Sequence, residues 1–370
     1  MSGWLDRVHA LRNRILADPR FQRYAVTSFL LRPIARARAR ALFDICAGFV
    51  YSQVLLACVR LGLLEILREG PQDVAQLSGR LSLPREAAER LLAAAAELGI
   101  AARRGAGRYG LGMHGAALLA NPGIARMVEH NALLYADLAD PVALLRGEVA
   151  ETALAGYWPY AGESAQAALD AARTRPYTEL MAASQELIAG HVLDAYPMSA
   201  HRCLLDVGGG DGSFLRAVAH RWPHLRLMLL DLPSVAAVAR ERFEAAGLAA
   251  RTSVFGGDFR ADALPQGADV ISLVRVLHDH DDATVMGLLR AARRALAPGG
   301  VLLVAEPMAA ARGARTVGGV YFAFYLMAMG RGRARQAEEL AAMMTAAGFA
   351  RVRPAPTHVP LQTGLIVGHA

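Results

Sequence analysis

The spacing of apolar residues divides this chain into an amino-terminal and a carboxyl-terminal part. Up to about residue 195, apolar positions recur every three or four residues, which is typical of amphipathic helices. From Ala200 onward, short apolar runs alternate with helical stretches, and this predicts an α/β fold with a mostly parallel, doubly wound sheet. The predicted strands are Arg202–Val207, Leu225–Leu230, Thr252–Gly256, Ala268–Val274, Val301–Glu306, and a pair near Ala350–Arg353 and Leu365–Gly368. The predicted helices between them include Val235–Ala246, Asp282–Leu296 and Arg335–Ala347.

The amino-terminal part contains a helix that is apolar around nearly its whole circumference. Residues 41–68 have few polar breaks, and such a helix needs partners on more than one side. A second subunit is one way of supplying them. The turn Gly70-Pro71 ends the element.

A winged-helix pattern follows this apolar helix. Asp73 can cap a short helix, Val74–Arg80, and a second helix spans Arg85–Leu98. Ile100–Leu111 has a glycine-rich turn between two short runs, which indicates a hairpin. A DNA-binding regulator with this pattern is an alternative of a different class. The helix that would read the bases offers glutamates among alanines, however, which do not suit base edges, so we expect no nucleic-acid partner.

Charge and composition indicate which partners and which cellular compartment to expect. The net charge of +7 comes from arginine, since the chain has no lysine, and it is concentrated in the first forty residues. Such a tract can contact anionic lipid or nucleic acid, or can be a solvated helical arm. No run of 18 uncharged apolar residues occurs and the amino terminus lacks a signal core, so we expect a cytoplasmic protein without a transmembrane helix. The three cysteines show no paired spacing, which favours buried thiols over disulfides or a metal site.

A glycine-rich turn provides the first candidate for chemistry. The run LLDVGGGDG ends an apolar strand and opens a helix, which is typical of a nucleotide-binding α/β unit. Its glycines follow the spacing Gly208-x-Gly210-x-Gly212, which differs from the dinucleotide fingerprint, and no phosphate-loop lysine follows. The turn therefore predicts close backbone contact with a ligand, unless it is a structural turn alone.

Polar residues also end the next four predicted strands. Asp231 lies about 20 residues after the glycine turn, the spacing at which a carboxylate meets ribose hydroxyls. Asp258 ends the third strand, His278 follows the fourth, and Glu306 ends the fifth. Because ligands bind beyond the carboxyl ends of parallel strands, these side chains are expected to share one site.

This set of segments resembles the S-adenosylmethionine-dependent small-molecule O-methyltransferases, which include plant phenolic enzymes, acetylserotonin enzymes and bacterial relatives. The segments that carry the resemblance are LLDVGGGDG, DLP, GGDF, VLHDHDD, APGG, VAEPM and AAGF. The arginine-rich start and the segment DICAGFVYSQVLLACVR make the chain most similar to the carotenoid branch of that family.

The resemblance implies a domain organisation. It comprises an arginine-rich arm (1–40), a winged-helix-like dimerisation domain (41–115), a helical connector or substrate lid (116–195), and an S-adenosylmethionine-binding Rossmann-like methyltransferase domain (196–370). A homodimer is implied as well.

The resemblance also assigns roles to the polar residues. His278 is the implied general base and Glu306 its supporting carboxylate. A base within hydrogen-bond reach of the acceptor hydroxyl contributes roughly 10²–10⁴-fold to the rate. Asp279, Asp281 and Asp282 are expected only to cap the next helix. The implied ligands of S-adenosyl-L-methionine are Gly208, Gly210, Asp231, Asp258, Phe259, Arg275 and Ser184, with no metal.

Two departures from the family pattern concern the base. His280 stands where the usual tryptophan follows the His-Asp pair, and the second supporting glutamate of the plant enzymes falls near Ala334.

The segment Tyr321–Met329 is long, apolar and rich in methionine. Such a segment is typical of a helix in the core, and it also suits the pocket of a lipid-like substrate. The implied reaction is methylation of a hydroxyl, the tertiary 1-hydroxyl, of an acyclic carotenoid. The alternative is another hydrophobic small molecule, namely a bacteriochlorophyll intermediate, a quinone or a polyketide phenol. Since carotenoids reside in the bilayer, we also expect peripheral contact with the inner or intracytoplasmic membrane through the first forty residues.

Overall fold

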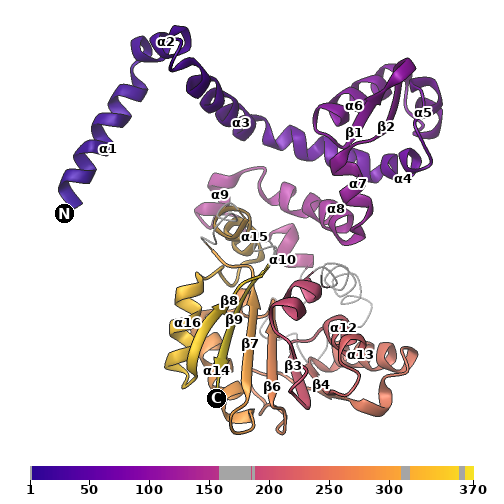
Figure 1. Cartoon of the computed structure of the whole chain (residues 1–370), viewed down its shortest axis with the longest axis vertical. Helices are drawn as coiled ribbons and strands as arrows, with labels where there is room; N and C mark the ends of the chain where they lie inside the picture. The colour runs from indigo at the N-terminus through magenta and orange to yellow at the C-terminus, as the bar shows by residue number, and fades with distance from the viewer. Residues whose placement is uncertain (1, 158–184, 186–187, 310–316, 358–362) are drawn as a thin grey trace. The chain divides into compact units, whose positions relative to one another are not determined.

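The computed structural model of the chain describes residues 2–157, 185, 188–309, 317–357 and 363–370. The chain divides into two compact units, residues 1–119 and 120–370. Both are drawn in Figure 1, and each has its own hydrophobic core.

The first unit is helical apart from one hairpin. Its core is formed by residues such as Cys58, Leu64, Leu77 and Leu92. Its elements are α1 (Ser2–Ala17), α2 (Pro19–Thr27), α3 (Arg32–Arg60), α4 (Leu63–Arg68), α5 (Val74–Arg80), α6 (Arg85–Glu97), β1 (Ala101–Arg104), β2 (Arg108–Leu111) and α7 (Met113–Leu119).

The predicted winged-helix elements are confirmed. Asp73 caps α5 in a capping box, in which its Oδ1 accepts the N–H of Gln76 at 2.9 Å and the Gln76 Oε1 accepts the N–H of Asp73 at 3.1 Å. β1 and β2 pair antiparallel. A DNA-binding protein of this pattern would place arginines of α6 and the hairpin against phosphates. The two on α6 pair instead with glutamates of the same helix, Arg85 with Glu89 and Arg90 with Glu86.

The apolar helix predicted over 41–68 is two helices. Gly62 takes a left-handed conformation with φ of 65°, which ends the first helix and starts α4. In the single chain, α3 leaves large apolar side chains exposed, among them Phe43, Ile45 and Phe49. Cys46 is exposed on the same helix, so the expectation of a buried thiol is wrong there, because the single chain supplies nothing that covers it.

Helix α3 is also long and apolar enough to cross a membrane, by length and composition alone. Its most apolar window has a mean hydropathy of 1.8, and 11% of that window is buried. The expectation of no such helix rested on uninterrupted apolar runs, whereas α3 carries charged residues at both ends.

The second unit contains a three-layer α/β domain preceded by short helices. These are α8 (Pro122–Asp137), α9 (Pro141–Leu145) and α10 (Ala153–Tyr157), and residues 188–195 are also helical. The strands are β3 (Cys203–Val207), β4 (Arg226–Asp231), β5 (Thr252–Gly256), β6 (Val270–Val274), β7 (Val301–Glu306), β8 (Ala350–Ala355) and β9 (Gly364–His369). The helices that follow strands include α12 (Ser213–Arg221), α13 (Pro233–Ala245), α14 (Asp282–Ala295), α15 (Phe322–Met329) and α16 (Ala337–Ala346).

All seven predicted strands are present in one sheet, in the order β5-β4-β3-β6-β7-β9-β8. The first five are parallel, and β9 runs antiparallel between β7 and β8. The strand order reverses at β3, which has β4 on one side and β6 on the other. A crevice at the carboxyl ends of such neighbouring strands is where this kind of sheet binds ligands.

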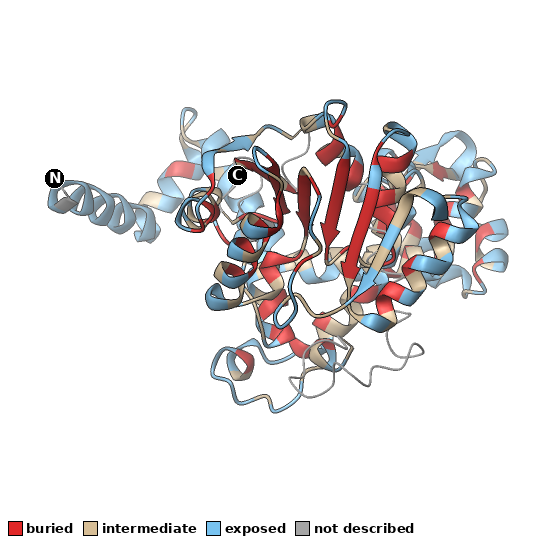
Figure 2. Cartoon of the chain, turned by 90° about the horizontal axis from the view of Figure 1, so that it is seen from below, coloured by how far each residue is buried: buried red, intermediate tan, exposed pale blue. Residues whose placement is uncertain are grey.

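Alternate side chains of the strands fill two separate cores. Leu205, Leu230 and Leu273 pack on the face covered by α14 and α16, whereas Leu204 and Leu229 pack on the face covered by α12 and α13. Figure 2 shows the resulting burial of the central strands. Because both faces are dry, most polar residues of the central strands lie near the strand ends, and the buried Ser272 within β6 donates its hydroxyl to Asp206.

Candidate active site

The glycine turn presents an open backbone at the end of β3. Gly208 and Gly210 both have positive φ, 70° and 59°. A Cβ on Gly208 would lie 2.7 Å from Cγ2 of Val276, whereas a Cβ on Gly210 would meet nothing within 4 Å. Gly208 is therefore required for packing, and Gly210 faces open space where a ligand can contact the main chain.

Asp231, at the end of β4, holds this turn in place. Its Oδ2 accepts the N–H of Gly210 at 2.8 Å, and its Oδ1 accepts the N–H of Leu232 at 2.7 Å. Burial raises the pKa of Asp231 to about 6, against these two hydrogen bonds, so the group is still ionised at neutral pH. An ionised carboxylate beside an open glycine turn fits the ribose hydroxyls of an adenosyl group.

Asp206 lies beneath the same turn. It is buried at the end of β3, and its Oδ1 accepts the Ser272 hydroxyl at 2.6 Å. Its Oδ2 has no hydrogen-bond partner among the described residues. Burial raises the pKa of Asp206 to about 7, so this carboxyl group is protonated in part of the molecules at neutral pH. It packs directly against the glycine turn at Gly209.

The end of β5 carries the residues expected to hold adenine. The Asp258 carboxylate is engaged by the guanidinium of Arg260, with Nη2 2.7 Å from Oδ2 and Nε 3.0 Å from Oδ1. Burial raises the pKa of Asp258, but the hydrogen bonds from Arg260 outweigh it and lower the pKa overall. Phe259 meets His280 edge to face, with ring centroids 5.3 Å apart. An adenine at this place would have to share Asp258 with Arg260.

The expected base and its expected carboxylate lie in direct contact. His278 and Glu306 are both buried, and His278 Nδ1 lies 2.7 Å from Glu306 Oε2. The other carboxylate oxygen accepts the N–H groups of Val276 at 2.9 Å and Leu277 at 2.6 Å. Glu306 is thus fixed by two main-chain donors and in turn fixes the imidazole.

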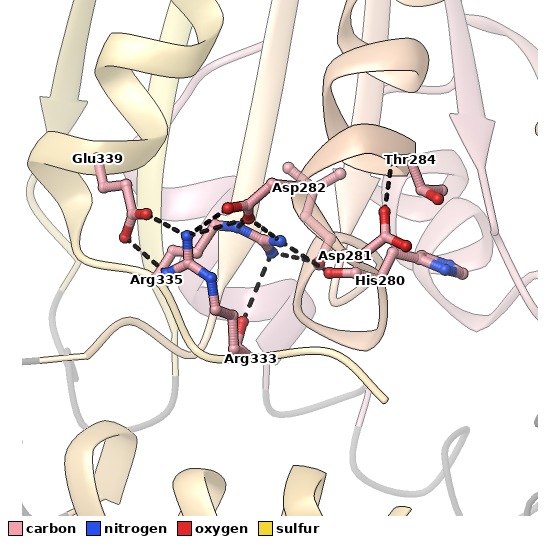
Figure 3. A network of polar contacts seen from close by, with 8 residues as sticks. His280, Asp281, Asp282, Thr284, Arg333, Arg335 and Glu339 are labelled. Carbon is pink, nitrogen blue, oxygen red and sulfur yellow. Dashed lines mark hydrogen bonds and ion pairs between the residues drawn. The ribbon is translucent and has the colours of Figure 1, made fainter. Parts of the chain in front are cut away.

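Asp279 also belongs to this site, which the sequence did not indicate. Its Oδ1 lies 3.2 Å from His278 Nε2. The expectation that Asp279, Asp281 and Asp282 all cap α14 is therefore wrong for two of them. Asp281 is the cap, since it accepts the N–H of Thr284 at 2.8 Å, and Asp282 pairs with arginines (Figure 3). Spacing cannot separate these roles because a tight turn sends neighbouring side chains in different directions.

The two histidines of this segment have opposite electrostatics. Burial alone would lower the pKa of His278, but Asp279 and Glu306 outweigh it and raise the pKa. At His280, burial and then Arg260 lower the pKa to about 4, so this ring is neutral at physiological pH. Arg275, on the same connection, has a positive φ of 58°, and its charge lowers the pKa of His278.

Aromatic side chains of the same unit lie beside His278. The Phe322 ring meets His278 edge to face at 5.8 Å, and Tyr321 and Tyr325 lie beside Phe322. The Tyr325 hydroxyl bonds to His130 Nε2 at 2.9 Å. In the predicted pocket segment, Tyr325, Leu326, Ala328 and Met329 are therefore buried in the core. Tyr321 and Phe322 form an aromatic wall near His278. His130 was not expected, and only its position as a polar residue on the apolar face of α8 could have indicated it.

A cavity of about 930 Å³ adjoins this wall. Asp279 and His280 line it from the loop before α14, and Ala323, Leu326 and Met327 line it from α15. Arg260, Arg331 and Arg333 line it as well, so this cavity combines an apolar side with a charged one. Ser184, the remaining expected cofactor ligand, lies outside the described residues.

Comparison with known proteins agrees with this architecture. The O-methyltransferase domain of the family matches residues 135–350, and the O-methyltransferase dimerisation domain matches residues 43–121. The chain is 46% identical to demethylspheroidene O-methyltransferase of Cereibacter sphaeroides over 93% of its length and 90% of the relative's. It is 44% identical to the Rhodobacter capsulatus protein of the same name over 91% and 84% of the two chains.

A solved structure gives the same result. The S-adenosylmethionine-dependent methyltransferase SibL superposes with a TM-score of 0.73 at 27% identity, covering 89% of this chain and 98% of that one. The dimerisation domain supports homodimer formation, and its match begins within α3, which leaves large apolar side chains exposed in the single chain. With its glycine turn, its strand-end carboxylates and its two matched domains, the chain belongs to the family of S-adenosylmethionine-dependent O-methyltransferases.

Proposed function

We propose that this enzyme methylates a hydroxyl group of an acyclic carotenoid, with the tertiary 1-hydroxyl as the acceptor. The proposal rests on the relatives at 46% and 44% identity, whose names give demethylspheroidene as the substrate. The observation that carries it is the buried His278–Glu306 pair beside the aromatic wall of Phe322. A base set against apolar surface suits a hydroxyl on a long hydrocarbon.

In this proposal His278 is the general base. Since Nδ1 bonds to Glu306, Nε2 is the nitrogen that takes the proton of the acceptor hydroxyl. Glu306 keeps the imidazole in the tautomer with its proton on Nδ1 and stabilises the imidazolium that forms. S-adenosylmethionine, when bound, supplies an electrophilic methyl group. Asp279 competes for Nε2 in the structure, so substrate entry has to displace this carboxylate or share the nitrogen with it.

The cofactor-binding roles follow from the strand ends. Gly208 and Gly210 would allow close main-chain contact, Asp231 would accept the ribose hydroxyls, and Asp258 and Phe259 would contact adenine. Arg275 and Ser184 keep the cofactor roles that the family resemblance implies. The arrangement supports these assignments through the open face of Gly210 and the ionised Asp231 beside it.

The test is a methyl-incorporation assay with radiolabelled S-adenosylmethionine. A hydroxylated acyclic carotenoid is expected to be methylated, whereas a simple phenol, a quinone and a bacteriochlorophyll intermediate are expected to be poor acceptors. Turnover of a phenol without product from any carotenoid would overturn the substrate assignment and leave the family intact.

We also propose that the amino-terminal arm contacts an anionic membrane on the cytoplasmic side. On α1, Trp4, Val8, Leu11 and Ile15 are spaced so that they share one face, and their exposed fractions are 70%, 43%, 57% and 42%. Arginines flank this face on both sides, at positions 7, 12 and 14. An amphipathic helix with tryptophan on its apolar face and arginine beside it is suited to the interface of anionic lipids.

Vesicle sedimentation tests this contact. The dimer is expected to bind phosphatidylglycerol vesicles better than phosphatidylcholine vesicles, less so at high salt, and to lose binding when residues 1–17 are removed. If the truncated enzyme binds as before but becomes monomeric, the arm belongs to the dimer interface and the membrane proposal is wrong.

A further inference from the structure

We infer that Arg335 is a positioning residue for the catalytic turn that carries His278. This inference rests on the proposed role of His278 as the base. The sequence predicts that Arg335 begins a helix, but the helix α16 begins at Ala337, and Arg335 lies in the preceding loop with its side chain buried.

The guanidinium of Arg335 binds both ends of the turn. Its Nη1 donates to the Leu277 carbonyl at 2.7 Å, and its Nη2 donates to the His280 carbonyl at 2.7 Å. These two residues enclose His278 and Asp279. Nη2 and Nε also bind Asp282 Oδ1, at 2.7 and 3.0 Å, which neutralises the buried charge (Figure 3).

Arg335 and Glu306 hold the same turn by opposite kinds of group. Glu306 accepts the N–H groups at its start, those of Val276 and Leu277. Arg335 donates to carbonyl groups at residues 277 and 280. A short 3₁₀ turn such as Leu277–Asp279 satisfies few of its own main-chain groups, so the two charged side chains complete its hydrogen bonding from both sides.

The loop that carries Arg335 packs directly against the main chain of His278. Gly332 has a positive φ of 78°, and a side chain there would occupy the place of the His278 carbonyl. The Arg335 carbonyl accepts the N–H of Ala309 at 2.9 Å, three residues after Glu306. The loop is thus tied both to the turn it supports and to the strand connection that supplies the carboxylate.

A guanidinium is the side chain that fits these demands. Its planar fork can donate to two carbonyls and one carboxylate at once, whereas a lysine ammonium is a compact charge that cannot reach all three in one plane. The plant enzymes have a second supporting glutamate near the position of Ala334. In this chain the next residue, Arg335, supports the turn through its carbonyl groups.

The test compares Arg335→Met and Arg335→Lys with a matched control. Arg251 also donates to main-chain carbonyls, those of Ala219, Pro223 and Leu225, but at the amino ends of the strands, away from the site. Arg251→Met therefore reports the loss of an arginine clamp that is structural alone. For each variant we would measure thermal unfolding, S-adenosylhomocysteine binding by calorimetry, and kcat across pH.

The positioning role predicts a distinct result for each quantity. Arg335→Met should lower kcat by roughly tenfold to a hundredfold, since small misplacements of a reacting group have effects of this size. Cofactor binding should change far less than kcat, by about twofold, because most of the assigned cofactor residues, among them Gly210 and Asp231, lie on other connections. A loosened imidazole also moves away from Asp279, Glu306 and Arg275, so the acid limb of the kcat profile should move. The kcat of Arg335→Lys should lie between those of the wild type and Arg335→Met. Arg251→Met should change the thermal unfolding temperature and leave kcat as it is.

Wild-type kcat and an unmoved pH profile in folded Arg335→Met would overturn the inference. If Arg335→Met does not fold, Arg335→Lys and Asp282→Asn, which loosens the same guanidinium from an exposed position, carry the test. If no Arg335 variant folds, Arg335 is a core structural residue and the inference is wrong. Activity in His278→Ala would instead refute the base assignment itself, so the two failures are distinguishable.

Discussion

The carboxylate of Glu306 lies 2.7 Å from Nδ1 of His278, although 28 residues separate the two in sequence. Two main-chain N–H groups hold the carboxylate, so the imidazole takes its orientation from a group that cannot easily rotate. The second ring nitrogen, Nε2, is then directed toward Asp279 and is the one available to a substrate hydroxyl. This relationship determines what each substitution in the site should do.

Replacing His278 with alanine should remove turnover and leave the cofactor bound. We expect kcat to fall by roughly 10²–10⁴-fold, the contribution of a general base. Calorimetry with S-adenosylhomocysteine should give a dissociation constant close to that of the wild type. Unchanged kcat would remove His278 from the role of base. His280→Ala is the companion variant, and it should lower kcat less, because the His280 ring faces Phe259 and makes no contact with Glu306 among the described residues.

The variant Glu306→Gln should fold and still be slow. The amide oxygen can accept the N–H groups of Val276 and Leu277, so the turn keeps its main-chain bonds. The amide NH₂ would then face Nδ1 as a donor, which selects the tautomer with the proton on Nε2, unsuited to a base. We expect kcat to fall by at least about a hundredfold, as when a base is held in the wrong tautomer. Nearly full activity would show that the tautomer is set by another group.

The acid side of the pH profile should depend on Asp279. Because the pKa of His278 is raised, the imidazole stays protonated, and inactive as a base, to a higher pH than an ordinary histidine with its pKa of about 6.5. Turnover should therefore rise with pH through that higher pKa. Asp279→Asn removes a charge that raises the pKa, so its acid limb should move to lower pH. A profile of kcat against pH measures this, and a limb that moves to higher pH would contradict it.

The same raised pKa has a consequence for stability. A group whose pKa is higher in the folded than in the unfolded chain stabilises the fold most below its unfolded pKa, and this contribution is lost as pH rises through the folded value. His278→Ala should therefore reduce the thermal midpoint more at pH 5.5 than at pH 8.5. Differential scanning fluorimetry at the two pH values, with His220→Ala, on the opposite face of the sheet, as a control, would show the difference. An equal reduction at both values would mean that His278 does not titrate as described.

Asp231→Asn should weaken the cofactor by about tenfold or more, because a ribose would lose a charged acceptor. Asp269→Asn is a matched control, since Asp269 also accepts two main-chain N–H groups, from Arg202 and Cys203, but at the amino end of the sheet. Calorimetry with S-adenosylhomocysteine should separate the two. Equal weakening in both would mean that Asp231 acts through stability alone.

The aromatic wall should govern the acceptor and leave the cofactor unaffected. Phe322→Ala should raise the KM for a carotenoid severalfold, since it removes an aromatic contact next to His278. Phe255→Ala, on the partly exposed strand β5, should leave that KM unchanged. A rise in the KM for S-adenosylmethionine in place of that for the carotenoid would show that Phe322 lines the cofactor site.

The sequence by itself determined the elements and the chemical residues at their ends. All seven strands were predicted, Asp73 caps its helix as expected, and His278 contacts Glu306. These features depend on short-range patterns. Buried strands must be continuous apolar runs, and polar residues that end neighbouring parallel strands must gather at one edge of the sheet.

Tertiary structure alone decided which polar groups surround His278 and the neighbouring strand ends. Asp279 was expected to be a cap, but its carboxylate lies against His278. Arg335 was expected to start a helix, but its guanidinium binds the turn that carries His278. The Asp258 carboxylate, expected to hold adenine, is bound by Arg260. His130 and Tyr325 meet across 195 residues. Each of these contacts depends on the direction in which a loop side chain leaves the backbone and on what lies there, and apolar periodicity carries no information about either.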